Sequence, residues 1–457
     1  MRQSNIKGDR GWSALWRTED WWAVWLALLL IFAVLISFNL GGTLKPIAVQ
    51  PGKWDQLGTI TTHFFQNAHW YIAQFSMWLA IFVVSNHFLG FRLKQYIPSF
   101  IFLYVLSTVI FTVSSWSPAK ALNLEAPLMA LIVGLFIGNF VKLPKWMYSG
   151  FRVEYYIKTG IVLLGATLPF TLIMYAGPVA LLQATIVSIT TFLAIYLFAV
   201  KIFRIDKRFA ACLGAGGAVC GVSAAIAMSG AVKAKKEHAS ITITIVIVWA
   251  MVMIFILPFA ARALNLHPGI AGAWIGTSEF ADAAGLAAAS QYGAVYETVY
   301  GFGRDEALWT YSLMKVIGRD MWIGVWAFIM ALVAILRWER SEKSEKPKAV
   351  EIWWRFPKFV IGFLVASAII TVVTSGVSLV EFNEVVKPML ITPIKTFRSW
   401  AFIFTFLSIG LTTKFKELTA AGWKPFGAFT FGVIINIILG FILSVIILGS
   451  YWSSIQA

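Results

Sequence analysis

Two basic residues in an otherwise apolar run are the first groups in the sequence that could do chemistry. Lys315 and Arg319 lie in the stretch YSLMKVIGRDMW, and a spacing of four places both side chains on one face of a helix. Two cations on one face can clamp a divalent oxyanion, to which an arginine guanidinium offers a fork of N–H donors. The alternative is a buried structural pair of Arg319 with Glu279 or Asp282. The pattern is compatible with both interpretations.

Two acidic residues occupy a second, weakly apolar stretch, GTSEFADAAGLAAAS at 276–290. Glu279 and Asp282 are three apart, so on a helix they share a face. Carboxyl groups inside an apolar segment are costly and by default indicate function, unless this segment lies at the outer rim in water. Because burial favours the neutral form of a carboxyl, either residue could carry a coupling proton or help to hold a cation. Ser278 and Thr277 are predicted to cap a half-helix.

The third candidate is the Gly-rich stretch GAGGAVCGVSAAIA. Each glycine inside a helix costs about 1 kcal/mol relative to alanine, so these glycines favour a bend or a break. Ser223 precedes the helix-forming run AAIA and is predicted to cap a half-helix, whose free N–H groups and dipole attract anions. The alternative is that the small residues, Cys220 in particular, only allow close helix packing. The candidate substrate-binding residues are Gly217, Cys220, Gly221, Ser223, Ser278, Lys315 and Arg319, and the candidate coupling residues are Glu279 and Asp282.

The composition indicates the class of protein in which these groups occur. The sequence has 457 residues, of which 59% are hydrophobic and 13% charged, and its mean hydropathy is +0.78; soluble domains carry about 25% charge. Apolar runs long enough to cross a bilayer recur along the chain, which predicts an all-α polytopic membrane protein with about 11 spans. Their expected ranges are 21–38, 70–90, 97–116, 126–141, 157–176, 178–200, 239–259, 311–336, 357–375, 397–413 and 425–450.

Two further segments, 209–232 and 269–292, are apolar but rich in Gly, Ala and Ser, and we predict both to be interrupted or re-entrant helices. With both treated as re-entrant, Lys and Arg gather in the loops on the side of the N-terminus, as is typical of the cytoplasmic side. This predicts a bacterial inner-membrane protein with a cytoplasmic N-terminus and a periplasmic C-terminus. The same bias explains the net charge of +16 without a nucleic-acid partner, since no basic tract is interleaved with aromatic residues.

Groups that would bind a metal or catalyse a reaction are not evident in the sequence. Cys212 and Cys220 form no CxxC pair, the five histidines are scattered, and HExxH is absent. We find neither a nucleophile–base pair nor a phosphate loop. The sequence therefore predicts no metal site, no cofactor and no enzymatic activity.

A faint internal repeat indicates a transport function. LLGATLPF (163–170) resembles LSIGLTTKF (407–415), and in the expected topology the two run in opposite directions. Inverted pairs of interrupted helices are the signature of secondary transporters, with chance similarity among apolar runs as the alternative. Pro169, inside a span, predicts a kink. On this basis 121–457 form a transport core, and 1–120 form a three-helix extension that serves as a scaffold or an interface, for example in a homodimer.

The same stretches carry a resemblance to a known family. Over about 125–450 the chain resembles the bacterial sulfate exporter family, inner-membrane proteins formerly grouped as a conserved hypothetical family, through CGVSAAIA, AVKAKKEHAS, SEFADAAG and KVIGRD. This chain has Ser278 before Glu279 where the family typically has His. It has three residues between Lys315 and Arg319 where the family has two. The resemblance implies an anion transporter with inverted repeats and interrupted helices.

Together these observations predict a secondary transporter that moves a small anion, such as sulfate, sulfite or a sulfonate, by alternating access. Coupling to a proton or Na⁺ would run through Glu279 or Asp282. The alternative is a gated anion channel, which needs neither an acidic coupling residue nor inverted symmetry.

Overall fold

The computed structural model describes residues 12–121, 126–168, 170–338, 357–378, 381–414 and 422–455. Within these ranges every regular element is a helix, apart from an isolated bridge between Trp54 and Trp116, so the predicted all-α membrane fold is confirmed. Six of the described helices are long and apolar enough to cross a membrane: Glu19–Asn39, Leu57–Phe88, Leu93–Ser114, Phe170–Lys201, Glu237–Ala263 and Trp423–Ile447. The further spans and the inverted repeat stay predictions. The kink expected at Pro169 falls outside the described residues.

The chain divides into two compact units. Unit 1 comprises 1–172 and 358–413, and unit 2 comprises 173–357 and 414–457. The helices of 1–120 belong to unit 1, together with later helices of the chain. The functional division into an extension and a transport core stays a prediction.

Unit 1 is a group of closely packed helices. They are α1 (Ala14–Arg17), α2 (Glu19–Asn39), α3 (Leu57–Phe88), α4 (Leu93–Ser114), α5 (Ser117–Ala121), α6 (Ala126–Phe140), η1 (Lys145–Ser149), α7 (Val153–Gly165), α17 (Lys358–Thr374), η4 (Phe382–Ile391) and α19 (Thr392–Thr412). α2 packs on α7 and α17, and α19 packs on α6 and α7. The approach of α6 to α19 is close, because a Cβ added to Gly134 would lie 2.7 Å from Leu407 O. Small residues at helix contacts are what a bilayer favours.

Ion pairs connect the start of α2 with Arg152, just before α7, and with the first turns of α7. Arg152 Nη2 lies 2.6 Å from Glu19 Oε2, and Lys158 Nζ lies 2.7 Å from Asp20 Oδ1. These pairs are mostly buried, and so are screened less than pairs on an open surface.

Unit 2 contains the helices that carry the candidate residues. They are α8 (Phe170–Lys201, from Ile173 onward), α9 (Lys207–Ala218), α10 (Val222–Ala231), α11 (Lys236–Ala263), α12 (Pro268–Ser278), α13 (Asp282–Tyr300), α14 (Arg304–Ser312), η2 (Leu313–Arg319), α15 (Trp322–Val333), η3 (Ala334–Trp338), α21 (Trp423–Phe441), η5 (Ile442–Ile447) and α22 (Gly449–Ser453).

α9 and α10 form a hairpin that returns to the end from which it starts. Arg208 Nη1, at the start of α9, donates a hydrogen bond to Lys233 O, just after α10 (3.0 Å). The ring of Phe209 stacks on that of His238 at the start of α11, with the ring centroids 4.6 Å apart. We call α9, α10 and the turn Val219–Gly221 the first hairpin. The predicted interruption is present, and the hairpin starts and ends at the same end of unit 2.

α12 and α13 form a second hairpin of the same kind. His267, before α12, and Phe302, after α13, have ring centroids 6.0 Å apart. A Cβ added to Gly303 would lie 2.7 Å from Pro268 Cγ, so the two open ends touch. We call α12, α13 and the break Glu279–Ala281 the second hairpin.

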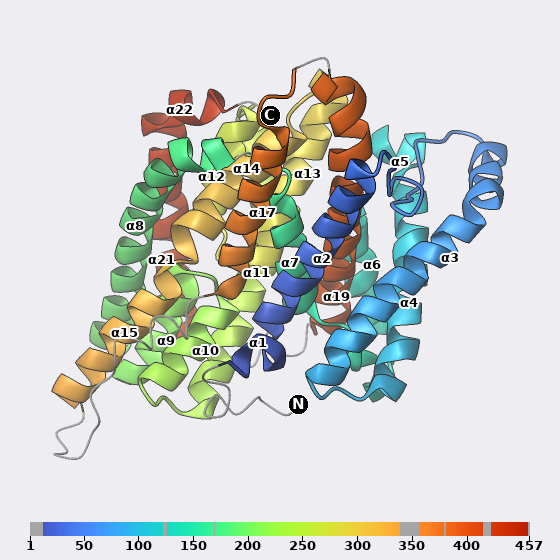
Figure 1. Ribbon diagram of the computed structural model, residues 1–457. Coiled ribbons are helices and arrows are strands. Elements are labelled where there is room, and N and C mark those ends of the chain that lie inside the picture. The colour runs from blue at the N-terminus through green and yellow to red at the C-terminus, as the bar shows by residue number, and fades with distance from the viewer. Residues whose placement is uncertain are drawn as a thin grey trace. The chain divides into compact units, whose positions relative to one another are not determined.

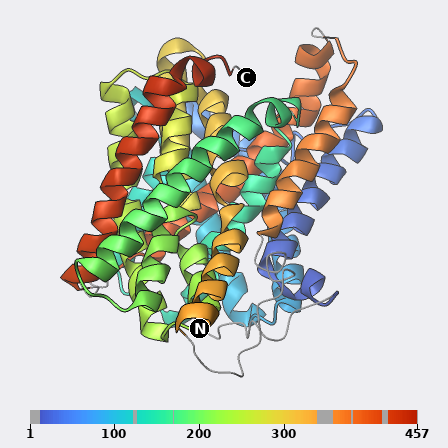
Figure 2. The ribbon, with the colours of Figure 1, turned by 90° about the vertical axis from the view of Figure 1, so that its left-hand side faces the viewer.

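The two hairpins start from opposite ends of unit 2. α11 joins their open ends and has 28 residues, which span about 42 Å at 1.5 Å per residue. Figures 1 and 2 both show α9 and α10 toward the lower end of unit 2 and α12 and α13 toward the upper end. The hairpins therefore point toward each other, tip to tip.

Candidate functional site at the hairpin tips

The tips of the two hairpins touch inside unit 2. Gly221 is the N-cap of α10, and its φ of +67° lies in a region that favours glycine. A Cβ added there would lie 2.8 Å from Val246 Cγ1 and 3.3 Å from Phe280 O of the second tip. The first hairpin therefore turns at a position where a side chain has no room.

Lys315 binds to both tips. Its fully buried Nζ donates to Val219 O of the first tip (2.7 Å) and to Phe280 O of the second tip (2.8 Å). The same nitrogen lies 3.1 Å from Asp282 Oδ1 and 3.7 Å from Asp320 Oδ1. A buried cation needs such partners because desolvation is otherwise costly. The ammonium therefore holds the two tips together.

Arg319 makes the second set of contacts between the tips. Its Nη1 donates to Thr277 O (2.5 Å) and to Glu279 O (3.2 Å), and its Nη2 donates to Gly217 O (3.0 Å). These carbonyls lie at the C-terminal ends of α12 and α9, which carry the negative ends of the helix dipoles. The guanidinium thus binds backbone oxygens rather than the carboxylates of the alternative interpretation, and the ion pair of Asp282 is with Lys315.

Both cations stand on η2, a π-helical segment. Asp320 N, directly after η2, donates to Lys315 O, five residues earlier, over 3.0 Å. Segments of this kind are rare and frequently occur at functional sites. The wider turn is the local structure that presents both side chains to the tips.

Three buried carboxyl groups accompany the two cations. Glu279, Asp282 and Asp320 are 0%, 8% and 0% exposed. Glu279 Oε1 accepts a hydrogen bond from Ala281 N (2.9 Å), whereas Glu279 Oε2 has no hydrogen-bond partner among the described residues. Asp282 is the first residue of α13, where the helix dipole favours a carboxylate. If all five groups were ionised, the tips would carry a net charge of −1.

The structure brings together the residues that the sequence singles out. Each lies in a hairpin tip, in the adjoining turn of a helix, or on η2, and the full set is Gly217, Cys220, Gly221, Ser223, Ser278, Glu279, Asp282, Lys315 and Arg319. Their roles in binding and coupling stay predictions. Within the described ranges, no group of three His, Cys, Asp or Glu side chains could hold a metal ion.

The predicted capping roles are wrong. Ser223 is the second residue of α10, because the turn at Gly221 starts the helix earlier and serves as its N-cap. Thr277 and Ser278 end α12 instead of starting a helix, and the N-cap of α13 is Ala281. The N-cap of α13 therefore lies three residues after Ser278.

Two amides outside the set of predicted site residues support the second tip. In the orientation that satisfies its neighbours, the Asn436 amide donates to Thr277 O and Ser278 O, both at 3.1 Å. Gln183 Nε2 donates to Ser444 Oγ (2.6 Å) and to Thr277 Oγ1 (3.3 Å). Each is a single amide in a long apolar helix. Polar groups in such places indicate either helix–helix bonding or a site. The sequence indicates helix–helix bonding for Asn436, which the structure has, whereas Gln183 was missed although the same signal applies to it.

Comparison with known proteins identifies a family. The model of the family described as conserved hypothetical protein 698 matches residues 98–429. A UPF0324 membrane protein of Rhodopirellula baltica is 33% identical over 412 residues, which cover 89% of this chain and 73% of that protein. A UPF0324 membrane protein of Nitrosomonas europaea is 30% identical, with 92% and 93% covered. One of Nitratidesulfovibrio vulgaris is 32% identical, with 78% and 60% covered.

The names of these relatives give a membrane location and no substrate. No solved structure matches the chain. The family model covers well over half of the sequence, including most of α4 and both hairpins. The chain belongs to the conserved hypothetical protein 698 family of membrane proteins.

Proposed function

We propose that this protein is a secondary transporter that carries a small anion across the bacterial inner membrane by alternating access, coupled to a proton or Na⁺. One observation carries the proposal: two re-entrant hairpins from opposite ends of unit 2 meet at Lys315 and Arg319. Interrupted helices that meet at a buried site are typical of secondary transporters. Irregular backbone at membrane depth is tolerated where it is buried in protein or lines a cavity.

Glu279 is the proposed carrier of the coupling cation. Its carboxyl group is fully buried, and its Oε2 has no hydrogen-bond partner among the described residues. It stands in a group where carboxyls outnumber cations by one. Because an uncompensated buried charge is costly, the tips favour one more positive charge. A proton on Oε2, or a Na⁺ ion beside it, supplies that charge.

The anion would bind where N–H donors converge. α10 and α13 both start at the tips, so their free N–H groups and the positive ends of their dipoles are directed there. Arg319 Nε is a buried donor that has no partner within the described part of the chain. A sulfate, sulfite or short sulfonate is the substrate class that the resemblance implies. Since an anion adds negative charge, it binds best after the coupling cation has bound. This order of binding links the flux of the anion to the flux of the proton or Na⁺.

Alternating access follows from the way the tips are held. Lys315 and Arg319 each donate hydrogen bonds to both hairpins. If one hairpin releases these bonds, the site opens toward one end of unit 2 while the other hairpin still closes the opposite end. In this mechanism the same two side chains bind substrate and close the gates.

A gated anion channel is the competing function. A channel lets the anion equilibrate down its own gradient, whereas a coupled transporter accumulates it against that gradient. The test is uptake of labelled sulfate, sulfite and methanesulfonate into proteoliposomes, with an imposed pH or Na⁺ gradient and without one. We expect accumulation above equilibrium for one of these anions, and its loss in the Lys315→Ala/Arg319→Ala variant. Equal, gradient-independent equilibration would support the channel instead.

A further inference from the structure

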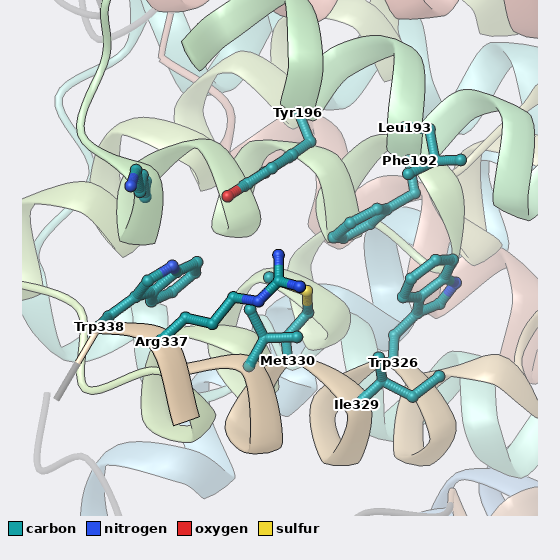
Figure 3. A pocket seen from close by; sticks show the side chains of 10 residues that line it. Phe192, Leu193, Tyr196, Trp326, Ile329, Met330, Arg337 and Trp338 are labelled. Atoms are coloured by element: carbon teal, nitrogen blue, oxygen red, sulfur yellow. The ribbon is translucent and has the colours of Figure 1, made fainter. Parts of the chain in front are cut away.

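A pocket of about 350 Å³ lies in unit 2 between the last turns of α8 and the segment formed by α15 and η3. Its walls are aromatic: the rings of Phe192 and Trp326 stack with centroids 4.0 Å apart and planes 14° apart. Figure 3 shows the Arg337 guanidinium and the Tyr196 hydroxyl pointing into the same space. The first residue of α9, Lys207, also lines the pocket.

Two cations line this pocket without a protein partner among the described residues. Within the described part of the chain, neither Lys207 nor Arg337 makes an ion pair or a side-chain hydrogen bond. The neighbouring carboxylate is already used, because Asp206 Oδ1 caps α9 by accepting from Arg208 N (3.0 Å) and Phe209 N (3.1 Å). The pocket therefore presents positive charge that an external anion can neutralise.

One side of the pocket joins an apolar surface. Leu193 and Ile329 line the pocket and are 43% and 38% exposed. Exposed apolar side chains recur along the membrane-length helix α8 at helical spacing: Leu182, Ile186, Ile189, Leu193 and Leu197. An exposed stripe of this kind on a membrane-crossing helix is a surface for lipid chains.

The pocket also lies near the end of the membrane-length helix α8, where such a helix is expected to reach the lipid headgroups. Tyr196 is five residues before the end of α8, and Lys207 is the first residue of α9. Tyrosine and tryptophan side chains gather at this depth because they have an apolar body and a polar tip. Charge, aromatic walls and an apolar exit therefore occur together at the boundary between membrane and water.

We propose that this pocket binds the phosphate headgroup of an anionic phospholipid such as phosphatidylglycerol. Lys207, Arg337 and the Tyr196 hydroxyl would bind the phosphate, and the acyl chains would lie along Leu193 and Ile329. Basic pockets between membrane helices select anionic headgroups in this way, and charge-assisted hydrogen bonds to phosphate are strong. A soluble phosphate compound offers the same charge but not the chains that the apolar side accommodates, so the geometry favours the lipid.

The test uses the full-length protein purified in detergent and the variant Lys207→Gln/Arg337→Gln. The melting temperature is recorded with added phosphatidylglycerol, with phosphatidylcholine, and with glycerol 3-phosphate as the soluble headgroup. A ligand that binds the folded state raises the melting temperature by mass action. We expect phosphatidylglycerol alone to raise it, and the variant to lose most of that rise.

The matched control is Lys142→Gln/Lys145→Gln, which removes the same charge from exposed positions of unit 1, just before η1 and at its first residue. The control should keep the full rise with phosphatidylglycerol. An equal rise in the pocket variant and the native protein would overturn the proposal. So would a rise with glycerol 3-phosphate that matches the lipid, because the site would then take a soluble anion. Neither result bears on transport through the hairpin tips, which the flux assay tests separately.

Discussion

Lys315 and Asp282 form a buried ion pair at the point where the two hairpins meet, with 3.1 Å between Nζ and Oδ1. The same ammonium donates to the backbone of both tips, so one side chain links the first hairpin, the second hairpin and η2. Tyr311, one turn earlier on α14, donates from its hydroxyl to Asp282 O (2.8 Å). Asp282, the first residue of α13, is therefore bound through both its side chain and its backbone oxygen.

Removing one charge of this pair should destabilise the fold. In Lys315→Met the Asp282 carboxylate loses its buried partner, and breaking a buried pair costs about 3–5 kcal/mol. Adding Asp282→Asn should recover part of the loss, because the orphaned charge is then gone. Thermal unfolding of the purified variants measures both effects, with the exposed Lys201→Met as control. If Lys315→Met alone unfolds at the same temperature as the native protein, the ion pair does not contribute as described.

The turn of the first hairpin should tolerate no side chain at Gly221. Gly221→Ala places a methyl group 2.8 Å from Val246 Cγ1 at a φ of +67°, and we expect a loss of about 1–3 kcal/mol. Gly230→Ala is the matched control in the same hairpin. No atom lies within 4 Å of its added methyl group, and alanine there should stabilise α10 by up to about 1 kcal/mol. Similar unfolding of both variants would show that the turn is not constrained as described.

The sequence was sufficient to predict the all-α class, the two interrupted segments and the polar groups that meet between them. Glycine and acidic residues in apolar runs are local signals, and they pointed to the correct segments. The partners of Lys315 and Arg319 could not be predicted, because both bind backbone carbonyls that belong to residues of any type. The capping error at Ser223 has a similar cause, since Gly221 turns the chain through its own φ without a capping side chain.

Re-entry of both hairpins predicts a labelling pattern. In a Cys212→Ala/Cys220→Ala background, Lys235→Cys reports on the open end of the first hairpin and Val299→Cys on that of the second. Both positions are exposed. A membrane-impermeant thiol reagent added to oriented vesicles should reach the two cysteines from opposite sides. The expected topology puts Lys235→Cys on the cytoplasmic side. Labelling of both from one side would contradict the opposed arrangement.

Arg319 should not be replaceable by lysine. Its guanidinium donates to Gly217 O, Thr277 O and Glu279 O from two nitrogens, a geometry that a single ammonium group cannot reproduce. Each carbonyl left without a donor costs about 1–3 kcal/mol. We expect Arg319→Lys to remain folded with a lower melting temperature and to transport more slowly. Unchanged stability together with unchanged flux would mean that these carbonyl bonds are dispensable.

The central claim is that Glu279 carries the coupling cation, and Glu279→Gln tests it most directly. Glutamine keeps the shape and an oxygen that can accept from Ala281 N, but it cannot take up a proton at the position of Oε2. The measurement is the internal pH of proteoliposomes, read with a trapped dye, when sulfate, sulfite or methanesulfonate is added outside, with and without Na⁺. In the native protein the transported anion should move protons, or require Na⁺. In Glu279→Gln the anion should still exchange across the membrane, but without proton movement and without a requirement for Na⁺. If Glu279→Gln moves the anion with undiminished proton or Na⁺ coupling, the carrier is another group and the account is wrong.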